Sequence, residues 1–161
     1  LVEDAGFDLV SAGIAMSIAQ ACGMAGRVLW GAAGGTLVDG ARLFGVLALA
    51  MTALAGGTLL LSPEVPRQAV YAFAAVFGAT ATGWGGLYIA EVAHRSVPGG
   101  ASRAAGGASA LSFAGCVLGP VAFAWIVAAT GRYAFGFLAI GVTTLAAALA
   151  LLLASSVRPP R

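Results

Sequence analysis

From Ser11 to Gly35 the chain carries a single charged residue, Arg27, in an otherwise uncharged and mainly apolar run. A helix rises about 1.5 Å per residue, so this run is long enough to cross the roughly 30 Å of a bilayer's hydrocarbon core. Asp39 and Arg42 then mark an aqueous turn, after which a second uncharged run begins. The segment therefore predicts a transmembrane helix that ends in a polar turn.

The composition extends this prediction to the whole chain. Of its 161 residues 60% are hydrophobic and only 9% are charged, which leaves too little polar surface to cover a soluble fold. Long apolar runs without strand-like alternation favour helices over a barrel. We expect an all-α fold, a polytopic transmembrane bundle that forms a single domain over residues 1–161. Its five helices are predicted at approximately 9–34, 43–61, 69–89, 105–129 and 134–153.

The arginines predict how the bundle is oriented. Alternate loops place one group on the same side of the membrane: Arg42, Arg95, Arg103, Arg158 and Arg161. Arg67, Arg132 and the acidic N-terminus fall on the other side. By the positive-inside rule we expect a cytoplasmic C-terminus and an outside N-terminus, in the bacterial cytoplasmic (inner) membrane. An outside first helix, a start at Leu1 and no basic signal region together predict a fragment of a longer protein.

Several functions are disfavoured by what the chain lacks. The formal charge of +2 is small and scattered, so we expect no nucleic-acid partner. Cys22 and Cys116 fall within predicted spans, and small packing residues are favoured over a disulfide or a metal pair, because His94 is the one histidine. Intramembrane catalysis needs a nucleophile with its base, paired acids or a metal cluster. We therefore predict no enzyme activity, cofactor or metal.

The first span has one face of small and polar residues at helical spacing: Gly13, Gln20, Gly23, Arg27, Gly31 and Gly34. We expect this face to look into the bundle, because exposing Arg27 to lipid costs a few kcal/mol. Two interpretations of Arg27 stay open. The guanidinium lines a substrate path, or it snorkels to the cytoplasmic headgroups or fixes a loop.

The third span divides into an aromatic face and a small-residue face. On the aromatic face, Trp84 and Tyr88 belong either to a binding site or to the core or an interfacial belt. Glu91, near the end of this span, forms a loop salt bridge or takes part in proton coupling.

The fourth span carries a small stripe and a proline. Ser112, Gly115, Gly119 and Ala122 align at helical spacing, and Pro120 cannot donate to the carbonyl of Cys116. A bend or hinge is expected there, with a packing kink as the alternative. The second and fifth spans are uncharged and are expected to be peripheral and lipid-facing.

Three patterns resemble the C-terminal half of a major facilitator superfamily transporter, with the five spans corresponding to helices eight to twelve. Gly26-Arg27-x-x-Trp30-Gly31 and Gly35-x-x-x-Asp39 resemble the eighth helix and its signature loop, although Gly40 stands where a basic residue is usual. Trp84-Gly85-Gly86-x-Tyr88-x-x-Glu91, followed by Pro98 and Arg103, is similar to the tenth helix and the next loop. Gly106, Gly115, Gly119 and Pro120 repeat the spacing of the antiporter motif, but Phe123 and Ala124 replace its final glycine pair.

The resemblance implies part of a secondary active transporter that moves a small solute by alternating access of two six-helix halves. Arg27 would favour an organic anion, because a buried guanidinium pairs with a carboxylate or phosphate. The implied partners are the lipid bilayer, a small-molecule substrate and a missing N-terminal half. The alternative is a non-transporting membrane subunit or an inactive remnant that packs against other transmembrane helices.

Three groups of site residues follow from the resemblance and the helical faces together. The substrate path would comprise Gln20, Arg27, Trp84, Tyr88 and Ser112. The loop or gating motif would comprise Gly35, Asp39, Arg42, Glu91 and Arg103. Helix packing or a hinge would involve Gly106, Gly115, Gly119 and Pro120.

Overall fold

The computed structural model describes residues 6–34 and 38–156, with side chains up to residue 153. Its helices are α2 (Leu9–Ala33), α3 (Gly40–Gly57) with the 3-10 turn η1 (Thr58–Leu60), α4 (Arg67–Ala81), α5 (Trp84–Arg95), α6 (Ala101–Thr130) and α7 (Tyr133–Ser156). Together they make five crossings long and apolar enough to span a membrane. The predicted all-α bundle of an integral membrane protein is confirmed.

The ends of the helices follow from local sequence. Asp8 caps α2 by accepting a hydrogen bond from the Ser11 backbone N–H, and Asp39 caps α3 by accepting one from the N–H of Ala41. At the far end of α6, Gly131 adopts a left-handed conformation with φ of +69°, which glycine reaches without a steric penalty. Polar or flexible residues therefore separate the apolar runs, as the sequence indicated.

The predicted bounds agree with the structure to within a few residues, with one exception. The span expected as one helix over 69–89 is divided into α4 and α5 by the pair Thr82–Gly83. No proline marks the position between Arg67 and Arg95, and the local signal is limited to glycines such as Gly83, which are weak helix formers. Gly35, Arg158 and Arg161, which entered the predictions above, lie outside the described residues.

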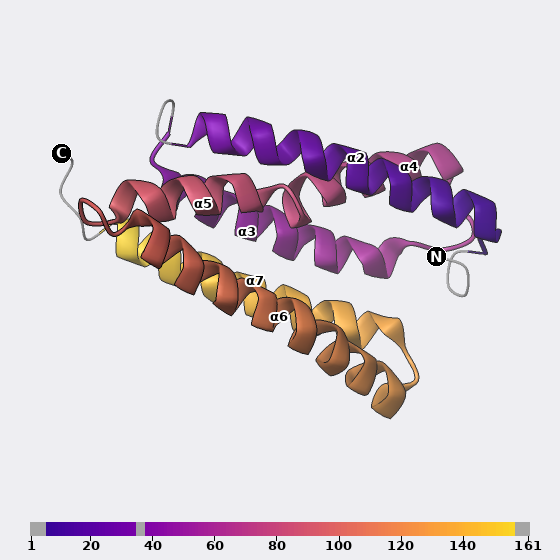
Figure 1. Cartoon of the computed structure of the whole chain (residues 1–161). Coiled ribbons are helices and arrows are strands. Elements are labelled where there is room, and N and C mark those ends of the chain that lie inside the picture. Colours follow the sequence, from indigo (N-terminus) through magenta and orange to yellow (C-terminus); the bar gives the residue numbers. More distant parts are fainter. Residues whose placement is uncertain (1–5, 35–37, 157–161) are drawn as a thin grey trace.

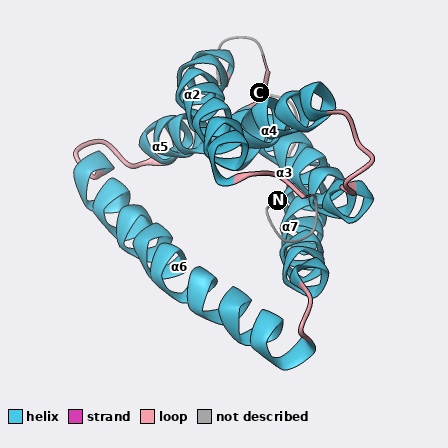
Figure 2. Ribbon diagram, turned by 90° about the vertical axis from the view of Figure 1, so that its right-hand side faces the viewer, coloured by secondary structure: helices cyan, strands magenta, loops and turns pink. Residues whose placement is uncertain are grey.

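The helices form two packed groups and one that stands apart (Figures 1 and 2). α2 packs along α4 and α5, and α3 packs along α7. The Thr52 and Thr144 hydroxyls lie 2.9 Å apart and join α3 to α7, where Leu47, Ala55 and Ala148 are buried. The second and fifth crossings, expected to face lipid, therefore also share a well-packed interface of their own.

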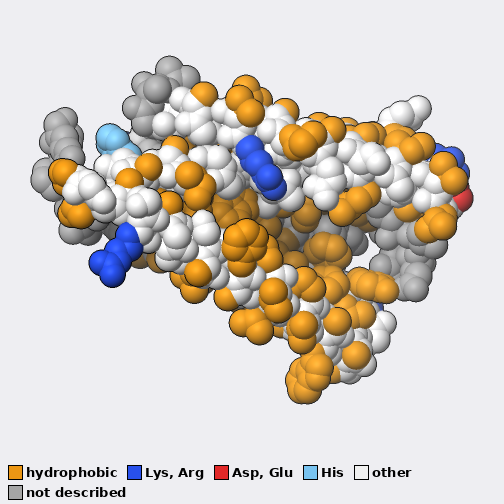
Figure 3. Space-filling model, viewed as in Figure 1, with side chains coloured by type: hydrophobic (Ala, Val, Ile, Leu, Met, Phe, Trp, Pro, Cys, Tyr) orange, Lys and Arg blue, Asp and Glu red, His pale blue; other side chains and the backbone are white. Residues whose placement is uncertain are grey.

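Helix α6 is the exception to this packing. It contacts the remaining helices mainly through α5 and α7, and none of its 30 residues is buried. Figure 2 shows it separated from α2 and α4. On the face seen in Figure 3, hydrophobic side chains are spread over the molecule and charged ones are few, as expected for a surface in contact with lipid.

Ion pairs tie the helix ends together and confirm which ends share a side. Arg67 at the start of α4 lies 3.6 Å from Asp8 at the start of α2. At the opposite end, Arg95 of α5 lies 3.8 Å from Asp39, just before α3. The alternation of loops used to predict the orientation is thus present in the structure.

Candidate functional site at the broken third crossing

The third crossing is interrupted near its middle, where α4 ends at Ala81 and α5 begins at Trp84. A helix end leaves its last carbonyl oxygens without intrahelical partners. Within a membrane, each unpaired backbone group costs several kcal/mol, so such a break persists only where other donors satisfy it.

Two side chains of α2 supply the missing donors. The Trp30 indole Nε1 donates to the Ala79 carbonyl oxygen at 2.8 Å, and the Arg27 Nε donates to the Thr82 carbonyl oxygen at 3.1 Å. The Gly78 carbonyl keeps its regular helical bond from the Thr82 N–H and also accepts the Thr82 hydroxyl, each at 3.0 Å. Side chains of α2 therefore satisfy two of the carbonyls that the break frees, those of Ala79 and Thr82.

Glycines bring α2 close enough for these bonds. A Cβ at Gly26 would come within 2.6 Å of the Ala79 carbonyl oxygen, and one at Gly78 would overlap the backbone of Ala19. A Cβ at Gly86 would likewise overlap the backbone of Arg27. This close approach of helices through small residues is typical of membrane proteins. It matches the small-residue face predicted for the third span.

The direction of Arg27 bears on the two interpretations left open above. Its Nε is bonded at Thr82, near the middle of the Arg67–Arg95 crossing, and Thr82 also touches Gly23, one turn earlier in α2. The guanidinium is therefore directed toward the centre of the membrane and away from the α2–α3 turn. This geometry favours an arginine that fixes a break, or that also lines a path, over one that snorkels to headgroups.

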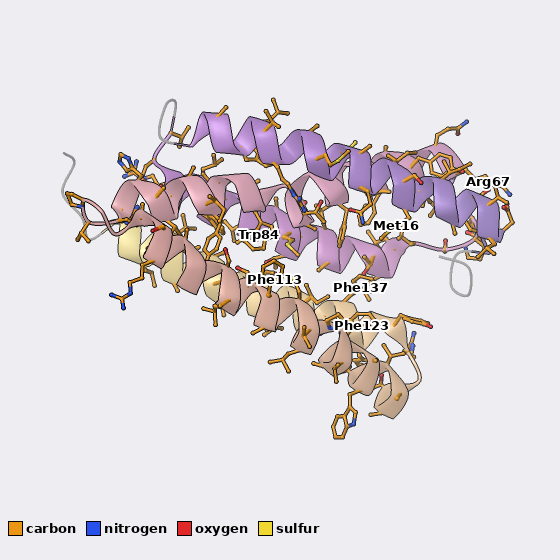
Figure 4. The ribbon with its side chains drawn as sticks, viewed as in Figure 1. Met16, Arg67, Trp84, Phe113, Phe123 and Phe137 are labelled. Atoms are coloured by element: carbon orange, nitrogen blue, oxygen red, sulfur yellow. The ribbon has the colours of Figure 1, made fainter. Side chains whose placement is uncertain are left out.

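Three of the predicted path residues meet on the other side of α5. The Trp84 and Tyr88 rings lie 5.5 Å apart in an edge-to-face arrangement, and Phe44 of α3 lies 5.9 and 6.1 Å from them. The Tyr88 hydroxyl donates to the Ala108 carbonyl oxygen of α6 at 3.3 Å, and Ser112 donates to the same oxygen at 3.0 Å. Figure 4 shows Trp84 on the side of α5 that faces α6.

The structure thus divides the predicted set instead of gathering it. Arg27 lies on the α2 side of the break, whereas Trp84, Tyr88 and Ser112 lie at the junction of α3, α5 and α6. Gly13, Gln20 and Arg27 itself are exposed, so the prediction that this face of the first span looks into the bundle holds only in part. Gly23, Gly31 and Gly34 of that face do lie against α4 and α5.

Sequence reasoning missed two residues of this region. Trp30 lies three residues after Arg27, a spacing that places both on one side of a helix, so its role could have been suspected. Phe44 gave no signal, because nothing distinguishes it from other apolar residues of the second span.

The predicted loop motif forms a charged cluster at the end where α3 begins. Arg95 is ion-paired with Glu91 one turn earlier and with Asp39. The Glu91 carboxylate also fills the space where Gly40 would carry a side chain, next to the positive end of α3. Glu91 therefore has the contacts of a loop salt bridge, while a part in proton coupling stays a prediction. Arg42 and Arg103 are exposed at this end.

At the opposite end of the bundle, Asp8 is held by several donors. The Ser11 backbone N–H and hydroxyl each donate to its carboxylate at 2.8 Å, and Arg67 adds its positive charge. These donors, the Ser11 backbone N–H first, lower the pKa of Asp8 below its ordinary value of 3.8.

An apolar cavity of about 220 Å³ lies between α2, α4 and α7. Its walls are almost free of polar atoms and belong to Ala15, Met16, Ala19, Thr58, Leu61, Val70, Phe73, Ala74, Phe77 and Phe137. Met16 and Phe137 are labelled in Figure 4. No wall is supplied by α6, and the cavity offers no groups that would orient a polar solute.

The residues predicted for packing or a hinge lie on α6. Gly106, Gly115 and Gly119 have nothing within 4 Å of a built Cβ, unlike the glycines of α2, α4 and α5 that meet a neighbouring helix. Pro120 lies inside α6, which continues to Thr130. The interrupted crossing is therefore the third, whereas the sequence predicted a bend or hinge in the fourth, at Pro120.

Comparison with protein-family models, curated proteins and solved structures gives no match.

Proposed function

We propose that this chain is part of a secondary active transporter of the major facilitator type, which moves a small organic anion by alternating access. The observation that carries the proposal is Arg27, a charged residue on a transmembrane helix whose guanidinium is directed at an interrupted crossing near mid-membrane. Ionisable residues within membrane spans are rare and usually mark a solute or ion pathway.

The geometry of the guanidinium supports an anionic solute. Only Nε is used in the hydrogen bond to Thr82, and the side chain as a whole is exposed. The two terminal nitrogens therefore remain for a carboxylate or phosphate, with which arginine forms paired hydrogen bonds. The first turn of α5 lies beside the guanidinium, because a Cβ placed at Gly85 would be 4.0 Å from the Arg27 Nε. Helix N-termini also favour negative charge.

The rest of the proposal concerns where the protein acts. We place it in a bacterial cytoplasmic membrane with the Asp39–Arg95 end facing the cytoplasm, because the arginine-rich loops lie at that end. The remaining half of the transporter would lie on the open side of α6, where no described helix covers it.

The first test measures the intact mass of the native polypeptide, which is extracted from its own membranes with an antibody to residues 157–161. Its intact mass is expected at about 2.5 times 15.8 kDa, the size of a twelve-helix carrier. Reconstituted in proteoliposomes, it should take up radiolabelled mono- or dicarboxylates in preference to neutral sugars. A full-length carrier that moved none of these anions would contradict the proposal.

One observation favours a second candidate, a non-transporting membrane subunit or remnant. The open glycines of α6 offer a surface for another transmembrane helix whether or not anything is transported. A native mass near 15.8 kDa with no uptake of any solute would favour this candidate.

A further inference from the structure

We propose that the third membrane crossing is a two-state element, either broken at Thr82–Gly83 or continuous, and that Arg27 and Trp30 hold it in the broken state. This inference concerns the fold alone and does not rest on the proposed transport.

The backbone at the break is already close to helical. Thr82 has φ of −113° and ψ of −14°, and Gly83 has φ of −73° and ψ of −25°, both in the right-handed helical region. The crossing contains no proline and has no residue with positive φ. Nothing covalent therefore prevents α4 and α5 from joining into one helix.

The two states exchange one set of hydrogen bonds for another. In a continuous helix, the Ala79 carbonyl would accept from the Gly83 N–H, and the Thr82 carbonyl from the Gly86 N–H. In the broken state the Trp30 indole and the Arg27 guanidinium take those places. The Ala79 and Thr82 carbonyls therefore have a donor in both states, and the two side chains of α2 favour the broken one.

Gly83 favours the broken state in a different way. In the structure, a Cβ at this position would overlap the Ala79 carbonyl oxygen. A regular helix, by contrast, accommodates a Cβ at every position. Any residue larger than glycine at position 83 is therefore compatible with the continuous state and not with the broken one.

The packing shows what can move. The first half of the crossing is fixed at the outer end by the Arg67–Asp8 ion pair and by Val70 in the apolar core. The second half packs against α2 through Gly86 and the fully buried Leu87, and it is joined to α6 through Tyr88 and Ala108. A change at Thr82–Gly83 would therefore shift α5 along α2 and carry α6, which has no buried residue, with it.

The test measures the distance across the break in the whole protein, in lipid nanodiscs. Spin labels are placed at Val76 and Ile89, exposed residues on α4 and α5, after Cys22→Ala and Cys116→Ala. Thirteen residues of continuous helix correspond to about 20 Å along the axis. Met16 and Leu29, exposed and equally spaced on the uninterrupted α2, provide the reference distance for these labels.

In the otherwise unaltered protein, we expect the distance between labels at Val76 and Ile89 to differ from the reference distance between labels at Met16 and Leu29. The double variant Arg27→Gln/Trp30→Phe should shift its main population to the reference distance, and Gly83→Ala should do the same independently. The matched control Arg42→Gln/Trp125→Phe changes an exposed arginine and an exposed tryptophan and should leave the distribution unchanged.

Three results would overturn the inference. Without any test substitution, the Val76–Ile89 label distance could already equal the reference distance, in which case the crossing is not broken. Both test variants could keep the wild-type distribution, in which case the side chains of α2 do not hold the break. The distribution could broaden without a population at the reference distance, in which case the crossing has no continuous state.

Discussion

The Arg27 Nε of α2 donates to the Thr82 carbonyl oxygen at 3.1 Å, across the interface between the first and third crossings. This bond fixes the Arg27 guanidinium at Thr82, the only place where the described part of a crossing is divided between two α-helices. The stability of the bundle and the proposed solute site both depend on it.

The Trp30 indole should contribute measurably to stability. Trp30→Phe keeps the ring contacts but leaves the Ala79 carbonyl without its donor, which is expected to cost about 1–3 kcal/mol of the free energy of unfolding. Unfolding by denaturing detergent in mixed micelles measures the change. Trp125→Phe, at a side chain that is 78% exposed on α6, is the control and should change little. Equal effects of both substitutions would contradict the assigned role of Trp30.

Glycines of the α2–α4 interface should tolerate substitution poorly, whereas those of α6 should not be sensitive. Gly78→Ala places a methyl group into the backbone of Ala19 and is expected to destabilise the protein by about 1–3 kcal/mol. Gly115→Ala meets open space and should be neutral or stabilising by up to about 1 kcal/mol. The same unfolding assay compares them, and a large loss at Gly115 in the isolated chain would show that α6 is packed.

The hydroxyl pair between α3 and α7 can be tested with a double-mutant cycle. Thr52→Val and Thr144→Val, alone and combined, should reveal a coupling energy of about 0.5–1.5 kcal/mol. Thr143→Val is the matched control, because the Thr143 hydroxyl bonds only to carbonyls of its own helix. A coupling as large between Thr52 and Thr143 as between Thr52 and Thr144 would contradict the assigned contact.

Asp8 should make stability depend on pH in the acid range. Its pKa in the folded protein is lowered, so its contribution is fully present above the ordinary value of 3.8 and is lost as the pH falls through the lowered pKa. Asp8→Asn should flatten this part of the stability curve. Ser11→Ala removes one donor to the carboxylate and should move the loss to higher pH. A shift to lower pH in Ser11→Ala would show that the hydroxyl does not stabilise the charged form.

Much of the fold could be predicted because a bilayer permits few solutions. Long apolar runs must be helices, and polar turns such as the one at Asp39 must lie between them. The break at Thr82–Gly83 could not be predicted, since it depends on donors from Arg27 and Trp30 that are distant in sequence.

The candidate site was predicted less completely for a similar reason. Helical spacing grouped Trp84 with Tyr88, and the structure confirms that they are in contact. It could not show that Phe44 joins them from another helix, or that Arg27 lies on the opposite side of α5. Spacing identifies a face of one helix, whereas the neighbour of that face is decided by tertiary packing.

The most direct test of the account is uptake of organic anions and neutral sugars by the full native protein carrying Arg27→Gln, with Arg42→Gln and Trp30→Phe as controls. Arg42 is an exposed loop arginine, and Trp30→Phe weakens the break without removing the charge. We expect Arg27→Gln to lower anion uptake at least about tenfold, equivalent to the loss of one charged hydrogen-bonded contact, while both controls retain it. Uptake of anions and sugars that is unchanged by Arg27→Gln would contradict it.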